Sequence, residues 1–193
     1  MSTTCPIRDG KKLEKFKEYY LTEKPVYRNY ALIILGLNTA FRIGDLLNLR
    51  WKDVFNERTE QIREHIRVKE QKTGKERVVA VNAAVAEVLE NLRETLPDAD
   101  EEQYLFPSTR KEGIPLSRSQ AFRIIREAAE QTGIEERISC HSLRKTFGYQ
   151  AWKQGAQPAV LMDIYNHSSY RVTRRYLGIE QDDRDRVYLN VHL

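Results

Sequence analysis

Cysteine is scarce in this chain of 193 residues: only Cys5 and Cys140 occur, and they do not form a C-x-x-C pair. Disulfide scaffolds and zinc fingers both need more cysteines at closer spacing, so these two classes are excluded and a reducing compartment is indicated. Long apolar runs are also lacking. The longest, from Ala31 to Leu37, is far shorter than the roughly 20 residues of a membrane span, and no contact with a membrane is expected.

The amino-terminal segment has neither the basic start nor the apolar centre of a secretory signal, so we expect the protein to stay in the cytoplasm. Internal repeats and low-complexity tracts are missing as well, and only residues 1–5 have the composition of a flexible end. Because 40% of the 193 residues are apolar, the chain is long enough for one buried core. We therefore expect a single domain over residues 1–193.

Lysine and arginine outnumber aspartate and glutamate by 32 to 28, an excess too small to prove a nucleic-acid partner. The distribution of the basic residues is more informative than their number. Charge runs are most often solvated faces, but here two of them coincide with segments that hold other functional candidates. The two groups are Lys69, Lys72, Lys75 and Arg77, and Arg171, Arg174 and Arg175.

Apolar periodicity predicts a mostly helical chain. Asp9 is placed to cap a first helix, and Pro25 separates that helix from a more buried second one. A third, short helix is expected around Leu46. Further helices are predicted from Ala83 to about Thr95, from the capping box at Ser117 to near Gly133, from His141 to Gly155, and from Pro158 onward.

Two segments depart from the helical period. Apolar residues alternate between Ile62 and Val81 on both sides of a turn-like Lys72-Thr73-Gly74-Lys75, which predicts one small antiparallel hairpin with Lys72 at its tip. The expected fold class is therefore mainly α with a small antiparallel β-sheet (α+β). At the carboxyl end, residues 187–193 alternate in the period of an edge strand, with a helix end as the alternative.

Several residues with catalytic potential occur at suggestive spacings. His141 and Arg144 stand three apart, on one face of a predicted helix, although H-x-x-R alone is a weak signal. His167 is followed nine residues later by Tyr176, which is a stronger combination. Upstream, Arg42 stands at the start of an amphipathic helix.

In this order the residues resemble the tyrosine recombinases, or phage-type integrases, from about Pro6 to Ile179. The T-G-x-R-x-x-E-L pattern of the family corresponds to the segment around Arg42, with Ala40 for glycine and Asp45 for glutamate. Asn166 replaces the usual glycine before the second histidine, and Lys145 stands where many members have histidine. The remaining correspondences are the hairpin lysine at Lys72, the H-x-L-R box at His141 and Arg144, the G-H-S-S box at His167, and the nucleophile at Tyr176.

The resemblance implies the catalytic domain of a site-specific DNA recombinase, which cleaves and rejoins strands through a 3′-phosphotyrosyl intermediate in integration, excision or inversion of a mobile or phage-type element. Attack on a phosphodiester puts negative charge on its non-bridging oxygens, which the planar guanidinium groups of Arg42 and Arg144 suit. Tyr176 would be the nucleophile, His141 the base that takes its proton, and Lys72 the acid that protonates the departing 5′ oxygen.

In the same scheme His167 would hydrogen-bond the phosphate, and Asp45 would orient the arginine or histidine beside it. No metal and no other cofactor is expected, because the arginines supply the positive charge. The expected partner is double-stranded DNA, on which the chain would form a homo-oligomer, a tetramer, with accessory DNA-bending proteins. Candidate DNA-binding residues are Lys69, Lys75, Arg77, Arg171, Arg174 and Arg175.

Many family members also carry an N-terminal core-binding domain, for which this chain has no room. Two explanations stay open: a catalytic domain cut from a longer protein, or a naturally short member like the fimbrial invertase group, which Met1 favours. Residues 177–193 correspond to a C-terminal tail that, in the family, often packs on a neighbouring protomer.

Simpler interpretations exist for each residue and for the whole chain. A lone histidine is usually a core or surface residue, and Arg42 could merely pair with Asp45. Two other functions are a type IB topoisomerase, which has a similar constellation, and a catalytically silent DNA-binding regulator. The integrase-like boxes disfavour the first and the complete set of six disfavours the second.

Overall fold

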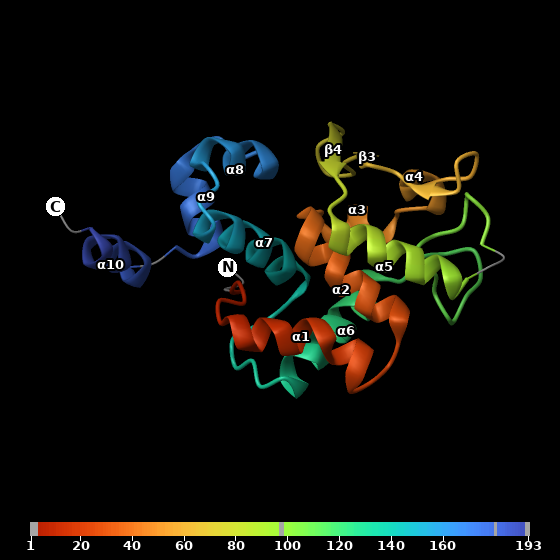
Figure 1. Cartoon of the computed structure of the whole chain (residues 1–193), viewed down its shortest axis with the longest axis horizontal. Coiled ribbons are helices and arrows are strands. Elements are labelled where there is room, and N and C mark those ends of the chain that lie inside the picture. Colours follow the sequence, from red (N-terminus) through yellow and green to blue (C-terminus); the bar gives the residue numbers. More distant parts are fainter. Residues whose placement is uncertain (1–3, 97–98, 180, 192–193) are drawn as a thin grey trace.

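Helices make up most of the architecture, and two short antiparallel hairpins complete it (Figure 1). This arrangement confirms the predicted fold class. A computed structural model describes residues 4–96, 99–179 and 181–191. Within these residues, none of the helices has the length and apolar character needed to cross a membrane.

The first two helices lie side by side. Helix α1 (Gly10–Thr22) begins at Asp9, whose carboxylate accepts a hydrogen bond from the Lys12 amide at 2.8 Å, as a capping residue does. Helix α2 (Tyr27–Thr39) follows Pro25, and most of its residues are buried. It supplies much of the core, because α1 and two later helices pack around it.

The segment after α2 holds two short helices and two hairpins, where the sequence predicts one of each. Their bounds are α3 (Ile43–Leu47), α4 (Trp51–Val54), β1 (Phe55–Asn56), β2 (Gln61–Ile62), β3 (His65–Lys69) and β4 (Glu76–Ala80). Strands β3 and β4 pair with Ile66 opposite Val79, which confirms the hairpin around Lys72. Ile62 belongs instead to the β1–β2 hairpin, because the chain turns at Arg63, whose amide donates to the last carbonyl of α4 at 2.7 Å.

Three longer helices complete the main body: α5 (Ala83–Glu94), α6 (Arg118–Gln131) and α7 (Cys140–Lys153). The capping box of α6 is confirmed, since Ser117 and Gln120 each accept a hydrogen bond from the other's amide. Helix α7 packs on α2, where Leu143 lies so close to Gly36 that any larger residue at that glycine would collide with it. This contact fixes the position of the helix that carries the H-x-x-R pair.

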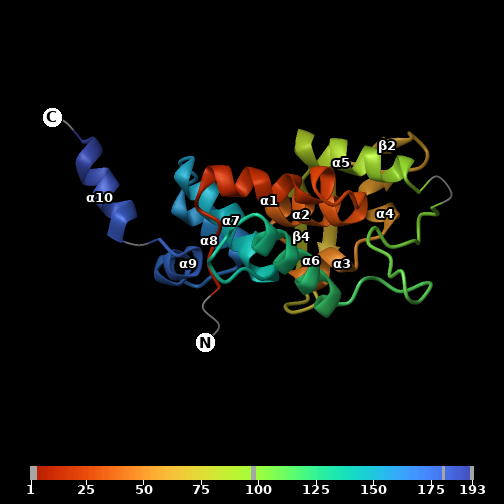
Figure 2. The same ribbon diagram turned by 90° about the horizontal axis from the view of Figure 1, so that it is seen from below.

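The last three helices are α8 (Pro158–Tyr165), α9 (Tyr170–Leu177) and α10 (Gln181–Asn190). Helices α8 and α9 close a small separate core with Leu161, Tyr165 and Leu177. Helix α10 extends away from the rest of the molecule in Figures 1 and 2. The predicted edge strand is wrong as far as Asn190, because no strand lies beside that part of the described chain and a helix satisfies its own backbone hydrogen bonds. Residues 192–193 of that prediction lie outside the described residues.

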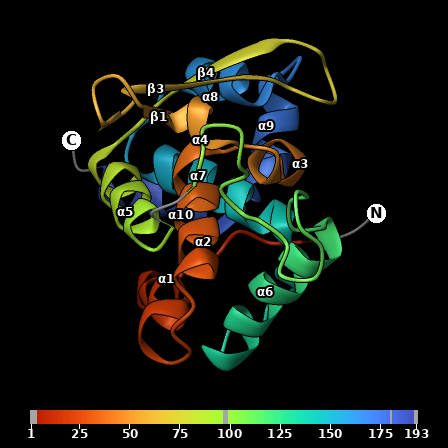
Figure 3. The same cartoon turned by 90° about the vertical axis from the view of Figure 1, so that its right-hand side faces the viewer.

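The sheets and the first helix occupy opposite ends of the main body. Strands β3 and β4 cross one end in Figure 3, and α1 and α6 lie at the other. The β3–β4 hairpin, whose turn includes Lys72, therefore lies at the end of the main body opposite α1 and α6.

Candidate active site

Arg42 lies at the N-terminal end of α3, just after a left-handed residue, Ala40 (φ 51°), that ends α2. This sharp change of direction brings the arginine to the β3–β4 hairpin. Its guanidinium Nη1 lies 2.6 Å from Oε2 of Glu70, and its side chain is 21% exposed. The carboxylate paired with Arg42 is thus Glu70 and not Asp45.

Asp45 instead contacts the hairpin. It is buried in α3, and its Oδ1 accepts a hydrogen bond from the Gln71 amide at 2.9 Å. Gln71 directly precedes Lys72, which is exposed in the turn. Asp45 therefore anchors the beginning of the turn that presents the lysine.

His141 and Arg144 occupy the first two turns of α7, which Ser139 caps. Arg144 is only 4% exposed. One guanidinium nitrogen donates to the Ala40 carbonyl and another to the Ile164 carbonyl at 3.5 Å, so the arginine links the end of α2 to α8. These bonds hold its guanidinium in place before any ligand arrives.

His167 and Tyr176 meet over a buried aromatic ring. The His167 imidazole is stacked on Tyr165 with 5.4 Å between ring centroids, and its Nδ1 lies 3.1 Å from Oγ1 of Thr173. Tyr176 on α9 lies 5.2 Å from His167 and 5.1 Å from Tyr165, again between centroids. Tyr165 also lies 4.6 Å from the guanidinium carbon of Arg144. One side chain thus supports three candidate catalytic groups.

The hairpin turn reaches across to this cluster. Lys75 Nζ donates to Oδ1 of Asn166 at 2.9 Å. Asn166 ends α8 in the left-handed conformation (φ 53°), which asparagine tolerates better than most residues with a side chain. The replacement of the family's glycine by asparagine therefore keeps the backbone turn and adds a contact with the hairpin.

The environment changes the ionisation of three of these groups. Burial raises the pKa of the Tyr176 hydroxyl, while the charge and the hydrogen bond of Arg144 act against that rise. Partial displacement of water from the imidazole, followed by the charges of Arg144 and Lys145, lowers the pKa of His141. Burial and the same Arg144 charge lower the pKa of His167. Both imidazoles are consequently neutral at pH 7, and each can accept a proton.

The six predicted basic residues divide into two groups. Lys69 and Lys75 on the hairpin, and Arg171, Arg174 and Arg175 on α9, are exposed. Arg77 points inward: it donates to the Thr39 carbonyl at 3.0 Å, lies over the Phe41 ring and approaches Glu70 Oε1 at 3.5 Å. Its guanidinium is occupied within the fold.

Sequence reasoning missed two residues of the cluster, Glu70 and Tyr165. Glu70 is an acid within a basic segment, and Tyr165 is an aromatic residue two positions before the histidine of the second box. These positions are the only signals that the sequence offers. A pairing between residues 28 positions apart, such as Arg42 and Glu70, cannot be read from local periodicity.

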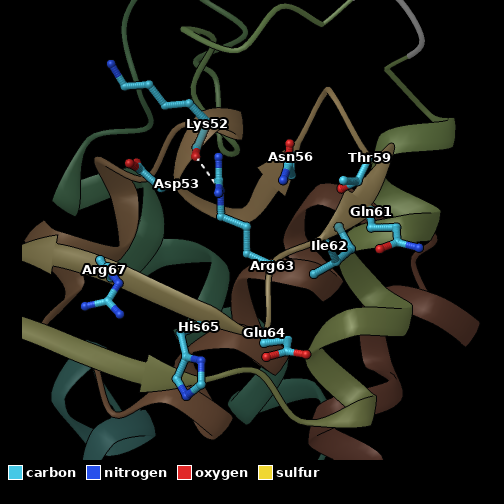
Figure 4. Close-up of a pocket in the computed structure, with 10 residues that line it drawn as sticks. All are labelled: Lys52, Asp53, Asn56, Thr59, Gln61, Ile62, Arg63, Glu64, His65 and Arg67. Carbon is cyan, nitrogen blue, oxygen red and sulfur yellow. Dashed lines mark hydrogen bonds between the residues drawn. The ribbon is translucent and has the colours of Figure 1, made fainter.

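A separate hollow of about 570 Å³ lies beside the two hairpins (Figure 4). None of the candidate catalytic residues named above lines it. Its cations are already engaged, since Arg63 donates to the Lys52 carbonyl at 3.0 Å and the Lys52 ammonium pairs with Glu102 at 2.6 Å. In the described residues, no group of three or more histidine, cysteine, aspartate or glutamate side chains is arranged to hold a metal ion.

Comparisons with known proteins identify the family. A model described as "Phage integrase family" matches residues 9–182. The chain is 40% identical to the probable integrase/recombinase YoeC of Bacillus subtilis (strain 168), over 97% of each chain. It is 33% identical to the type 1 fimbriae regulatory protein FimE of Escherichia coli (strain K12), over 77% of this chain and 73% of FimE.

The fold matches solved structures of recombinases. The XerH site-specific recombinase, in a post-cleavage complex with a palindromic difH substrate, superimposes with a TM-score of 0.76 at 20% identity. That match covers 98% of this chain and 54% of XerH, so the chain spans about half the length of that relative. The chain belongs to the phage integrase family, the tyrosine recombinases, whose reaction is the cleavage and rejoining of DNA in site-specific recombination.

Proposed function

We propose that this chain cleaves DNA with Tyr176 as the nucleophile and rejoins it through a 3′-phosphotyrosyl intermediate. One observation carries the assignment: Tyr176 on α9 lies against Arg144 of α7 and against His167 in the turn between α8 and α9, at a place where Arg42 and the Lys72 turn also meet. Chance packing rarely gathers such groups, and each has a role in phosphoryl transfer.

The reaction balances without a cofactor. The Tyr176 oxygen attacks phosphorus as its proton passes to His141, and the bond from phosphorus to the 5′ oxygen breaks as Lys72 supplies a proton to that oxygen. Arg42 and Arg144 neutralise the charge that develops on the non-bridging oxygens, and His167 donates a hydrogen bond to one of them. The 5′ hydroxyl reverses these steps during rejoining, so the bond energy is conserved.

The acid–base properties of the site support these roles. The raised pKa of Tyr176 means that its hydroxyl stays protonated at neutral pH, so a base has to act during the attack. His141 has a lowered pKa and is therefore in the form that accepts a proton. The buried Arg144 guanidinium lies where it stabilises the phenolate that forms.

We further propose that double-stranded DNA lies against the hairpin and α9, with phosphate contacts from exposed basic residues. The candidates are Lys69, Lys75, Arg171, Arg174 and Arg175. Arg77 is better suited to supporting Glu70 than to binding phosphate, because its guanidinium is engaged internally. Such an interface predicts a steep fall in DNA affinity as salt is added, and a flat response in a filter-binding titration would contradict it.

Residues 1–193 would act in the cytoplasm as one catalytic domain that assembles into a tetramer on DNA, with accessory DNA-bending proteins. Helix α10 would mediate the assembly. Four apolar residues near its end are 56–80% exposed: Val187, Tyr188, Leu189 and Val191. A second copy that covered them would bury this surface. Removing residues 187–193 should then weaken assembly on DNA, as measured by light scattering; unchanged assembly and cleavage would argue against the idea.

The decisive experiment is covalent trapping on a nicked suicide duplex taken from the ends of the element that encodes the chain. Wild type should give a shifted band on a denaturing gel without added metal, and Tyr176→Phe should give none. Tyr170→Phe is the matched control, since Tyr170 begins the same helix and is 39% exposed. Tight DNA binding without a wild-type adduct would favour a silent regulator. Relaxation of plasmids that lack a specific site would favour a topoisomerase.

A further inference from the structure

Glu70 is a buried carboxylate with three cationic or hydroxyl partners. Its side chain is 7% exposed. Oε2 lies 2.6 Å from Arg42 Nη1 and accepts a hydrogen bond from the Thr73 hydroxyl at 2.7 Å, while Oε1 lies 3.5 Å from Arg77 Nη1. A single oxygen therefore stands between Arg42 and a residue of the hairpin turn.

The backbone of Glu70 closes the same turn. Its amide donates to the Lys75 carbonyl at 2.9 Å, and its carbonyl accepts from the Gly74 amide at 2.8 Å. Gly74 has a positive φ of 68°, which permits the tight return of the chain. Glu70 thus forms the base of the loop on which Lys72 is exposed.

The charge of Glu70 is maintained despite its burial. Burial alone would raise the pKa of this carboxyl, but the hydrogen bonds from Arg42 and Thr73 and the positive charges of Arg42 and Arg77 hold the pKa below its usual range. The carboxylate is consequently ionised at neutral pH. An ionised group between two guanidinium groups resists displacement more than a neutral one would.

We propose that Glu70 is a positioning residue that fixes the Lys72 turn relative to Arg42, and hence relative to the scissile phosphate. The inference rests on the proposed function and adds to it a residue with no role there. Arg42 meets the phosphate and Lys72 meets the leaving oxygen, so the distance between them determines whether one phosphodiester can engage both. The Asp45–Gln71 hydrogen bond holds the start of the turn, and the Arg42–Glu70–Thr73 chain of contacts connects the turn directly to the arginine.

A purely structural ion pair is the alternative, because removal of one partner from a buried pair destabilises a protein without any catalytic meaning. A positioning role and a purely structural role can be distinguished by changing the leaving group of the DNA substrate. A suicide duplex with sulfur in place of the bridging 5′ oxygen releases a thiolate, which needs no general acid because a thiol has a pKa of about 8.5. Misplacement of Lys72 should therefore slow cleavage of the oxygen substrate only.

Thr73→Val is the first variant, since it breaks the link to the turn while the Arg42–Glu70 pair stays. We expect single-turnover cleavage of the oxygen duplex, at saturating protein, to fall about tenfold, a part of the roughly 10²- to 10⁴-fold that a general acid contributes. The sulfur duplex should restore the rate to within about twofold of wild type, as it should for Lys72→Ala, because no general acid is then needed.

Glu70→Gln is the second variant, because it keeps the shape but removes the charge that Arg42 needs. This variant should cleave the oxygen duplex more slowly than Thr73→Val does. The sulfur duplex should restore only the part of the cleavage rate that is lost through misplacement of Lys72. Glu76→Gln is the matched control: Glu76 is on the same hairpin, is 67% exposed and is 3.7 Å from Arg67. It should cleave both duplexes as wild type does.

Three outcomes would overturn the inference. Wild-type rates for Thr73→Val and Glu70→Gln on both duplexes would leave Glu70 without a role in positioning. Equal losses of cleavage rate on the oxygen and sulfur duplexes would show that Glu70 acts without Lys72. Failure of the wild type itself to form an adduct on DNA that it binds would instead remove the proposed function, and the role of Glu70 with it.

Discussion

The two sides of the candidate site are built differently. On one side, which we call the packed flank (residues 140–177), the catalytic candidates rest on buried side chains such as Tyr165 and Leu177. On the other, the hairpin flank (residues 70–75), most residues are exposed, and the turn is held by individual hydrogen bonds that Asp45 and Glu70 accept and that Lys75 donates.

This difference has a physical consequence. Apolar packing is a collective property of many contacts, so the packed flank fixes Arg144, His167 and Tyr176 with little freedom. Each bond named here involves a charged group and contributes only about 1.5–3 kcal/mol, so the position of the hairpin flank depends on a few individual contacts. Arg144, His167 and Tyr176 are thus on the packed flank, whereas the proposed proton donor, Lys72, is on the hairpin flank.

The largest expected effect is on the packed flank. Arg144→Lys should reduce single-turnover cleavage by about 10²-fold or more, because a lysine has no planar fork with which to bind the Ala40 and Ile164 carbonyls and also face the phosphate. Arg126→Lys, in an exposed pair with Glu130, is the control. A loss of less than tenfold would mean that Arg144 is chiefly structural.

Gly148→Ala tests the packing itself. An added Cβ would overlap the Tyr165 hydroxyl and a methyl group of Leu177, so we expect a loss of about 1–3 kcal/mol in the free energy of unfolding. Urea denaturation followed by circular dichroism measures it. Gly10→Ala, where nothing lies within 4 Å of the new methyl group, should leave stability unchanged or slightly higher. If the two variants denatured alike, the packed flank would be less rigid than described.

The pH dependence of cleavage tests His141. A lowered pKa means that a lower pH is needed to protonate the imidazole, so the rate should stay constant down to the ordinary histidine pKa of about 6.5 and then fall about tenfold per unit below the shifted value. His65→Gln, at an exposed position on β3, should have the same profile. An inflection above about pH 6.5 would point to a different base.

The smallest effect is expected on the hairpin flank. Asn166→Gly keeps the left-handed end of α8 but removes the oxygen that accepts from Lys75, so cleavage should fall only about threefold. Asn166→Ala should lose about 1 kcal/mol of stability in addition, because alanine resists a positive φ. A large loss in the glycine variant would mean that the hairpin flank is as tightly constrained as the packed flank.

Much of the fold follows from local signals. Asp9, Ser117 and Pro158 mark helix starts that the structure confirms, because capping depends on neighbouring residues alone. The last segment was harder to assign. The alternating residues from Val187 fit a strand or a helix, and as far as Asn190 the absence of a neighbouring strand in the described chain decides for the helix.

The candidate site divides in the same way. The order and spacing of the family motifs select Arg42, His141 and Tyr176, since the resemblance supplies information that local periodicity lacks. Glu70 and the inward direction of Arg77 are not predictable, because both depend on how α3 and the hairpin pack in three dimensions. Burial is also the first cause that lowers the pKa of His141 and of His167, and burial is a property of the fold.

The contact between Asn166 and Lys75 also has an evolutionary consequence. Among relatives, a lysine at position 75 gains a partner across the site only where position 166 has a side chain that accepts a hydrogen bond and tolerates a positive φ. Asparagine satisfies both conditions, and glycine satisfies the second alone. The two positions are therefore expected to covary: lysine should be retained at position 75 where position 166 is asparagine, and position 75 should vary where position 166 is glycine.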